Sequence, residues 1–316
     1  NALKSLETGN LANRLTESIE LRHFVAKSHY MRTGTLRYFE VQIVEADEGN
    51  LSLAKDETMD ADGRILFVIS PSEKKRAASM KWVRQNTKAL ASTIFAFPKP
   101  ISGLETALLE LEVWKWIDRH VKQLEGDPVA RKEVGHRITI AKSGLNEVVG
   151  RVIGLRGQEF TTSDSEWFHM GKKTKHNNYR DFTAWISEIC NDEFSSSPII
   201  INEIINRNQI SRPAAGAVKK LISKMLENPE KERLGIEGYP PEISIYNSLL
   251  LQGGFHRRPQ GRPRHEEPVW LFGEPNKNWM PVWKEISKFL KTTRQSRKPI
   301  TDLYAVLRSR PYGLRK

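Results

Sequence analysis

The sequence has a single cysteine, Cys190, and no long apolar run. One cysteine excludes an internal disulfide and a zinc site built from thiolates, and such sparing use is typical of a reducing cytoplasm. No segment approaches the roughly 18 consecutive apolar residues that a membrane-spanning helix needs. The first residues also lack the apolar core and cleavage site of a secretory signal. We therefore expect a cytoplasmic protein with no membrane partner.

Patterns of catalytic residues are also scarce. The sequence has no G-x-S-x-G nucleophile motif, and its eight histidines are scattered without the i,i+4 spacing of a helical metal site. Asp62, Glu73 and Lys75 have the loose spacing of a metal-dependent nuclease, but Glu73 also suits the first turn of a helix. We predict no catalytic residue, no metal and no cofactor. The alternatives are a metal-dependent nuclease that uses Asp62, Glu73 and nearby carboxylates, and a purely structural protein-interaction module.

Positive charge is abundant and unevenly distributed. The 316 residues include 50 Lys and Arg against 38 Asp and Glu, a net charge of +12. Residues 198–316 hold 22 of the basic and 11 of the acidic residues, so that 22 minus 11, or +11, belongs to this part. A localised basic surplus indicates a polyanionic partner such as DNA. A solvated basic surface without a partner is the simpler alternative.

The first half of the chain has the pattern of an α/β module. A helix is predicted within residues 1–30, and residues 35–46 have the composition of a strand. Two short apolar runs, 64–70 and 92–99, indicate strands buried on both faces. Helices are predicted after each of them, and Asp127 followed by Pro128 begins another. We expect a small parallel sheet with flanking helices over residues 1–156.

The second half has the pattern of a mainly helical, winged-helix-like module over residues 157–316, and the polar segment 156–166 is the expected linker at the boundary. Its segment 202–226, "NEIINRNQISRPAAGAVKKLISKML", resembles a helix-turn-helix. Helices are predicted over 199–207 and 213–227, with Ser211 as the cap of the second helix. The inward residues of that helix are predicted to be Val218, Leu221, Ile222, Met225 and Leu226. A helix pair that only packs is the competing interpretation.

The cations of this half are the candidate DNA contacts. Some lie on the predicted second helix or just before it, and others lie in the Gly-, Pro- and Arg-rich segment 253–268. The candidates are Arg207, Arg212, Lys219, Lys220, Lys224, Arg257, Arg258, Arg262 and Arg264. The expected partner is double-stranded DNA or another protein subunit.

Several segments together resemble a known family. "RHFVAKSHYMRTGTLRYFEV", "SPIIINEIINRNQIS", "LGIEGYPPEISIYNSLLLQGGFHR" and "TDLYAVLRSRPYGLRK" are similar to a central section of very large bacterial P-loop ATPases of BREX-type anti-phage defence systems and their relatives. In that family the ATPase motor lies toward the N-terminus, and this sequence has no such motor. The resemblance implies a non-catalytic segment of a defence-associated ATPase. Since the chain does not begin with Met, we expect a fragment of a longer protein.

Overall fold

The computed structural model divides into two compact units. It describes residues 11–19, 21, 23–52, 60–70, 72–88, 90–99, 103–153, 155–156, 159–160, 165–207, 209–259, 269–294 and 296–315. Unit 1 comprises Asn1–Val25 and Tyr38–Ile186, and unit 2 comprises Ala26–Arg37 and Ser187–Lys316. The division in this structure therefore differs from the one expected at residue 156. It falls after Ile186, and an early segment of the chain belongs to the second unit.

Unit 1 is built on one mixed sheet of six strands. These are β1 (Phe24–Val25), β2 (Tyr38–Glu45), β3 (Gly63–Ile69), β4 (Thr93–Phe97), β7 (Glu166–His169) and β8 (Lys172–Thr174), in the order β1-β2-β3-β4-β7-β8. The pairs β2–β3 and β3–β4 are parallel, as expected. The outer pairs are antiparallel, and the sequence did not predict β7 and β8. The α/β module is confirmed, with a mixed rather than a parallel sheet.

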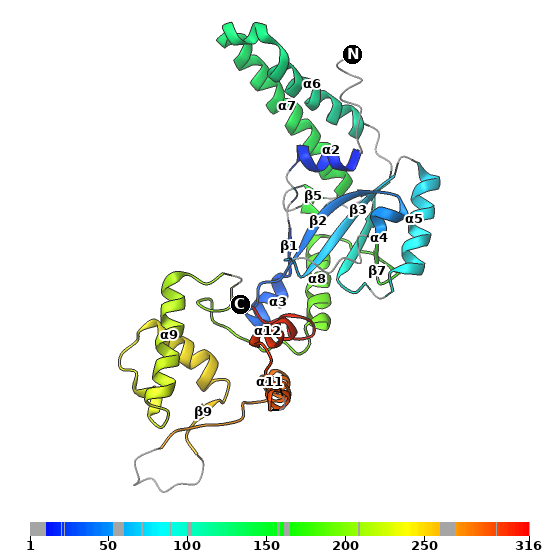
Figure 1. The fold of residues 1–316 in the computed structure, drawn as a ribbon. Helices are drawn as coiled ribbons and strands as arrows, with labels where there is room; N and C mark the ends of the chain where they lie inside the picture. The colour runs from blue at the N-terminus through cyan, green and yellow to red at the C-terminus, as the bar shows by residue number, and fades with distance from the viewer. Residues whose placement is uncertain are drawn as a thin grey trace. The chain divides into compact units, whose positions relative to one another are not determined.

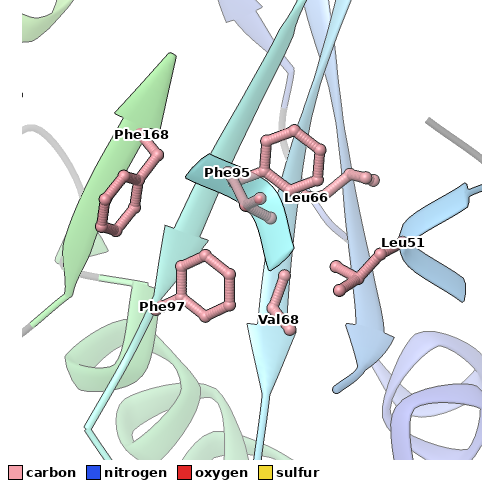
Figure 2. Packing of buried hydrophobic residues seen from close by; sticks show 7 residues of the cluster. Leu51, Leu66, Val68, Phe95, Phe97 and Phe168 are labelled. Carbon is pink, nitrogen blue, oxygen red and sulfur yellow. The ribbon is translucent and has the colours of Figure 1, made fainter. Parts of the chain in front are cut away.

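The two apolar runs form β3 and β4, which lie at the centre of the core of unit 1. Every residue of β3 and β4 is buried, which confirms the prediction of strands covered on both faces. Figure 2 shows one face of the sheet, where Leu66, Val68, Phe95, Phe97 and Phe168 pack with Leu51. The rings of Phe97 and Phe168 meet edge to face at 5.7 Å. Phe67 points to the other face and packs edge to face on Trp167 at 5.5 Å.

The helices of unit 1 begin largely where the sequence predicts. Ser72 caps α5 (Glu73–Asn86), and the Asp127 carboxylate accepts hydrogen bonds from two backbone amides of the first turn of α7 (Pro128–Ile153). α7 lies beside α6 (Leu104–His120), as Figure 1 shows. The remaining elements are α2 (Leu11–Ser18), α4 (Glu48–Ser52), η2 (Lys122–Gly126), the strand pair β5 (Leu155–Arg156) and β6 (Glu159–Phe160), and α8 (Tyr179–Glu193), which continues into unit 2.

The helix predicted within residues 1–30 is shorter than expected. The described part ends at Ser18, and Phe24 and Val25 instead pair with β2. A separate helix, α3 (Lys27–Thr33), follows in unit 2 and ends at Gly34, whose φ of 74° is the left-handed conformation that glycine adopts readily. The apolar residues of this segment therefore belong to different elements. Leu15 lies in α2 and Phe24 lies in β1, and both are buried.

The described residues of unit 2 form helices and a two-stranded sheet. Its elements after α3 are α9 (Arg212–Glu227), η3 (Glu232–Gly235), α10 (Pro241–Ile245), the π-helical η4 (Tyr246–Leu251), β9 (His256–Arg257), β10 (Leu271–Phe272), α11 (Met280–Thr293) and α12 (Ile300–Arg308). The helix predicted over 213–227 is confirmed as α9. None of the helices described is both long and apolar enough to cross a membrane.

A buried arginine joins distant segments of unit 2. Arg37 is 0% exposed, and its Nη2 donates to the Ser197 hydroxyl at 3.2 Å and to the Gly313 carbonyl at 3.1 Å. Its guanidinium lies 3.5 Å from the centre of the Phe194 ring. Its Nε donates to His29 Nε2 at 3.1 Å, so the Nδ1 of that ring carries the proton. These contacts explain why residues 26–37 belong to a unit formed mainly by the end of the chain.

Candidate nucleic-acid interface

The predicted recognition helix exists as α9, and most of its cations face solvent. Ser211 caps it, since the Ser211 hydroxyl accepts from Ala214 N at 3.3 Å. Arg212, Lys219 and Lys220 are exposed. Lys224 is half-buried and pairs with Glu227 at 3.0 Å. Arg212, Lys219 and Lys220 can therefore bind a polyanion without first breaking an ion pair to another described residue.

The inward face of α9 is narrower than predicted. Leu221 is buried, and Val218 and Met225 pack partly against the same core. Ile222 and Leu226, however, are 52% and 80% exposed, so the prediction that they face inward is wrong. The fully buried partners of α9 all follow it in the chain, whereas Ile204 and Ile205, which are partly buried against the same cluster, precede it. The fully buried partners are Leu234, Ile236, Ile243, Ile245 and Tyr246.

The predicted first helix over residues 199–207 does not form. Asn202 Oδ1 accepts from Ile204 N at 2.9 Å, and its Nδ2 donates to the Ser248 hydroxyl at 2.8 Å. Asn206 Nδ2 donates to Thr35 Oγ1 and to the Ile200 carbonyl, both at 2.9 Å. Asparagine side chains that bond to nearby backbone compete with a helix, and here they hold a series of turns.

The loss of that helix changes the motif. Arg207 lies on a turn, where it is 3.5 Å from Glu203, and it does not belong to a recognition helix. α9 instead packs on α10 and η4, which follow it. The prediction of a helix-turn-helix over residues 202–226 is therefore wrong. The arrangement present is two successive helices followed by the pair β9–β10, which is antiparallel.

A buried histidine fixes the base of the β9–β10 pair. His256 is 0% exposed, and its Nε2 donates to the Pro229 carbonyl at 2.9 Å. Its Nδ1 therefore accepts from the Tyr246 hydroxyl at 2.8 Å. The Phe272 ring of β10 lies 4.6 Å from the imidazole. Burial lowers the pKa of His256 and raises the pKa of Tyr246, so both groups are neutral at pH 7.

The arginines of this hairpin start next to that anchor. Arg257 and Arg258 are exposed, and Arg257 Nη1 donates to the Glu274 carbonyl at 2.8 Å. That contact leaves the positive charge of Arg257 uncancelled, since a carbonyl carries no net charge. The other two candidates of the segment, Arg262 and Arg264, lie outside the described residues. The structure therefore brings together two of the four predicted loop arginines at the base of the pair.

The residues of the nuclease alternative do not meet. Asp62 precedes β3, where its Oδ2 accepts from Tyr38 N at 3.1 Å. Glu73 begins α5 beyond the other end of β3 and lies 3.4 Å from Arg76. Asp62 and Glu73 lie beyond opposite ends of β3, a seven-residue strand that spans roughly 23 Å, so they are not placed to hold one metal ion. Among the residues that the structure describes, no group of three or more His, Cys, Asp or Glu could hold a metal.

The other carboxylate near Glu73 is fully occupied by cations. Glu166 accepts from Arg76 at 2.8 Å and also from Lys173. The hydrogen bond from Lys173 lowers the pKa of Glu166, although burial opposes this shift. Arg76 also donates to the Phe97 and Pro98 carbonyls, both at 3.0 Å. This cluster ties the ends of β4 and β7 to α5, which is a structural role.

A third basic surface was missed by the sequence analysis. Lys284, Lys288 and Lys291 lie on α11 and line a groove together with Trp283. Their spacing of four and three residues places them on one side of a helix. The apolar residues Val282, Ile286 and Phe289 follow the same spacing and pack on the other side. In "VWKEISKFLK" the lysines and the apolar residues each repeat at helical spacing, on opposite sides of the helix. This pattern is the sequence signal that could have identified the surface.

No protein-family model matches this chain, and neither a curated protein nor a solved structure matches it. The similarity to defence-associated ATPases therefore stays a hypothesis. The inference of function rests on the surfaces of unit 2, because the basic surplus lies in residues 198–316.

Proposed function

We propose that unit 2 is a winged-helix-like module that binds duplex DNA, within a non-catalytic segment of a bacterial defence-associated ATPase. The observation that carries this proposal is the exposure of Arg212, Lys219 and Lys220 on α9, together with the exposure of Arg257 and Arg258 in the same unit. The order helix, helix, two-stranded sheet, with an Arg-rich connection in the sequence, supports the winged-helix-like part of this proposal. The surplus of +11 in residues 198–316 supports the same partner.

The distribution of these cations favours binding to phosphates over reading of bases. In helix-turn-helix proteins the second helix enters the major groove. Here the second position is held by α10 and η4, Pro241–Leu251, which contain no Lys or Arg. The cations lie on the first helix, on β9 and, in the case of Arg258, just after β9. Such contacts position a protein on DNA without specifying sequence, so we expect sequence-independent binding.

The salt dependence of DNA binding tests this proposal. Each phosphate that a protein neutralises contributes a slope of about −0.9 to log affinity against log salt concentration. Five exposed cations predict a slope of up to about −4.5 for a duplex of any sequence, measured by fluorescence anisotropy. A flat response, or no binding at low salt, would remove the DNA function.

A partner subunit is the second candidate, favoured by one observation. Ile222 and Leu226 are exposed on α9, one turn apart and on the same side of the helix as Lys219. Exposed apolar side chains at this spacing are typical anchors of a helix that docks on another protein. Under this alternative, Ile222→Ser with Leu226→Ser abolishes copurification with proteins encoded by neighbouring genes and leaves DNA affinity unchanged.

A further inference from the structure

The groove beside α11 combines positive charge with an aromatic ring. Its volume is about 620 Å³, and it is open to solvent. The lining residues are Glu274, Met280, Trp283, Lys284, Ser287, Lys288, Lys291 and Thr292. All except Glu274 belong to one helix, so a single rigid element sets their spacing.

The packing of α11 on α12 determines which side chains of α11 line the groove. Val282, Ile286 and Phe289 pack against Leu303 and Leu307 of α12. At 100° per residue, the lysines of the groove lie on the opposite side of the helix. The rise of 1.5 Å per residue spreads their three ammonium groups over roughly 10 Å along the axis. A chain of phosphates is the kind of ligand that meets several evenly spaced cations.

The lysines retain most of their charge. Lys288 lies 3.5 Å from Glu285 but is 75% exposed, and such an exposed pair is weak. In the described part of the chain, Lys284 and Lys291 form no ion pair. Among the described residues that line the groove, Glu274 is the acidic one. Three cations against one carboxylate make the groove complementary to an anion.

Trp283 adds a surface on which a base can stack. It is half-buried, and the Phe255 ring supports it at 5.9 Å with an angle of 65° between the rings. Phe255 is itself held by Trp279 at 5.4 Å. A fixed aromatic ring beside a row of cations is the combination by which proteins bind unpaired nucleotides. Paired bases are stacked within a duplex and cannot reach such a ring.

We infer that this groove binds a single-stranded nucleic acid, with its phosphates on Lys284, Lys288 and Lys291 and a base on Trp283. The site goes beyond the proposed duplex-binding function, because it uses a different helix and a different form of nucleic acid. A module that holds a duplex at α9 and an unpaired strand at α11 would suit a junction between the two forms.

The test measures the anisotropy of a labelled oligothymidine strand on the full chain. Replacing Lys284, Lys288 and Lys291 with Ala lowers the affinity at least tenfold and reduces the salt slope by about 2, which is 0.7 for each of three phosphates. Trp283→Ala lowers the affinity roughly tenfold, and Trp283→Phe restores part of it because a ring remains. Circular dichroism melting verifies that each variant is folded.

The control carries the same charge change elsewhere. Lys122, Lys132 and Lys142 are exposed in unit 1, and their replacement with Ala leaves oligothymidine binding unchanged. An equal loss in the control and in the α11 variant overturns the inference, as does absence of single-strand binding by the wild-type chain. Lys219→Ala with Lys220→Ala separates the two proposals, since it weakens binding of duplex DNA alone. Loss of the duplex function therefore leaves this inference standing.

Discussion

Unit 1 and unit 2 are stabilised in different ways. In unit 1, β3 and β4 bury every residue, and large apolar side chains fill both faces of the sheet. In unit 2, α9 buries only Ala214, Ala217 and Leu221 fully, and Arg37 and His256 lie in the interior with hydrogen bonds. The first kind of core is continuous and consists of apolar side chains. The second depends on a few polar groups, each of which must keep its partners.

The two units also differ in the surface that they offer to a binding partner. The basic surplus of +11 lies in residues 198–316, where the helices are amphipathic and their outer faces carry lysine. The apolar strands of unit 1 have no outer face to offer, because helices or loops cover them. A binding function is therefore expected in unit 2, and substitutions should affect the two units through different properties.

The largest effect is expected from Phe67→Ala in unit 1. Phe67 is 0% exposed and packs on Trp167, so its truncation leaves a cavity and lowers the free energy of unfolding by about 3–5 kcal/mol. Leu226→Ala is the matched control, because that side chain is 80% exposed. Urea denaturation measures both. A loss below about 1 kcal/mol for Phe67→Ala would show that β3 is not a core strand.

Arg37→Ala probes the polar core of unit 2. The substitution leaves the His29 ring and the Gly313 carbonyl without their donor, and we expect a loss of about 3 kcal/mol in the stability of unit 2. Arg258→Ala, at an exposed position, should change it by less than about 0.5 kcal/mol. Equal stabilities of the two variants in thermal denaturation would refute the role given to Arg37.

Acidification is expected to weaken unit 2 through His256. Burial lowers the pKa of His256, so the unfolded chain binds a proton more readily than the folded one. The stability that this group contributes is complete above its unfolded pKa of about 6.5 and declines as the pH falls below it. The slope approaches at most about 1.4 kcal/mol per pH unit for one proton.

His256→Gln checks this pH dependence by denaturation at about pH 7.5 and about pH 5.5. The variant should be less stable at the higher pH but lose less stability on acidification. His176 of unit 1 also has a pKa lowered by burial, so some pH dependence remains in unit 1. The same acid loss in the variant and the wild type would exclude His256 as its source.

The sequence predicted the elements whose signals are local. Continuous apolar runs identified β3 and β4, and the Asp127–Pro128 pair identified the start of α7. Its prediction for residues 199–207 was wrong because the run of isoleucines resembles a helix face, whereas Asn202 and Asn206 bond to the backbone and to residues far along the chain. Apolar spacing alone does not reveal that competition.

The candidate site was only partly accessible to sequence reasoning. Lys219 and Lys220 were placed correctly on the outside of α9, since their neighbours Val218 and Leu221 define its inner face. Ile222 and Leu226 were misplaced, because the width of the buried face depends on which elements cover the helix. The groove beside α11 depends on the packing of α11 on α12 and on Glu274, which a linear pattern does not show.

The smallest effect on stability, and the most direct test of the account, comes from Lys219→Ala with Lys220→Ala. Both side chains are exposed, so the free energy of unfolding should change by less than about 0.5 kcal/mol. If α9 binds phosphates, affinity for duplex DNA should fall and the salt slope should decrease by about 1.8. Val218→Asp and Leu221→Asp are the contrasting variants, because each places a charge against the core and should destabilise unit 2.

The deciding measurement is duplex affinity and thermal stability on the same preparations of the wild-type chain and these three variants. The account predicts that the double-Ala protein melts like the wild type and binds DNA more weakly. Unchanged DNA affinity in that protein would contradict it, and would identify α9 as a packed helix of the scaffold that does not contact DNA.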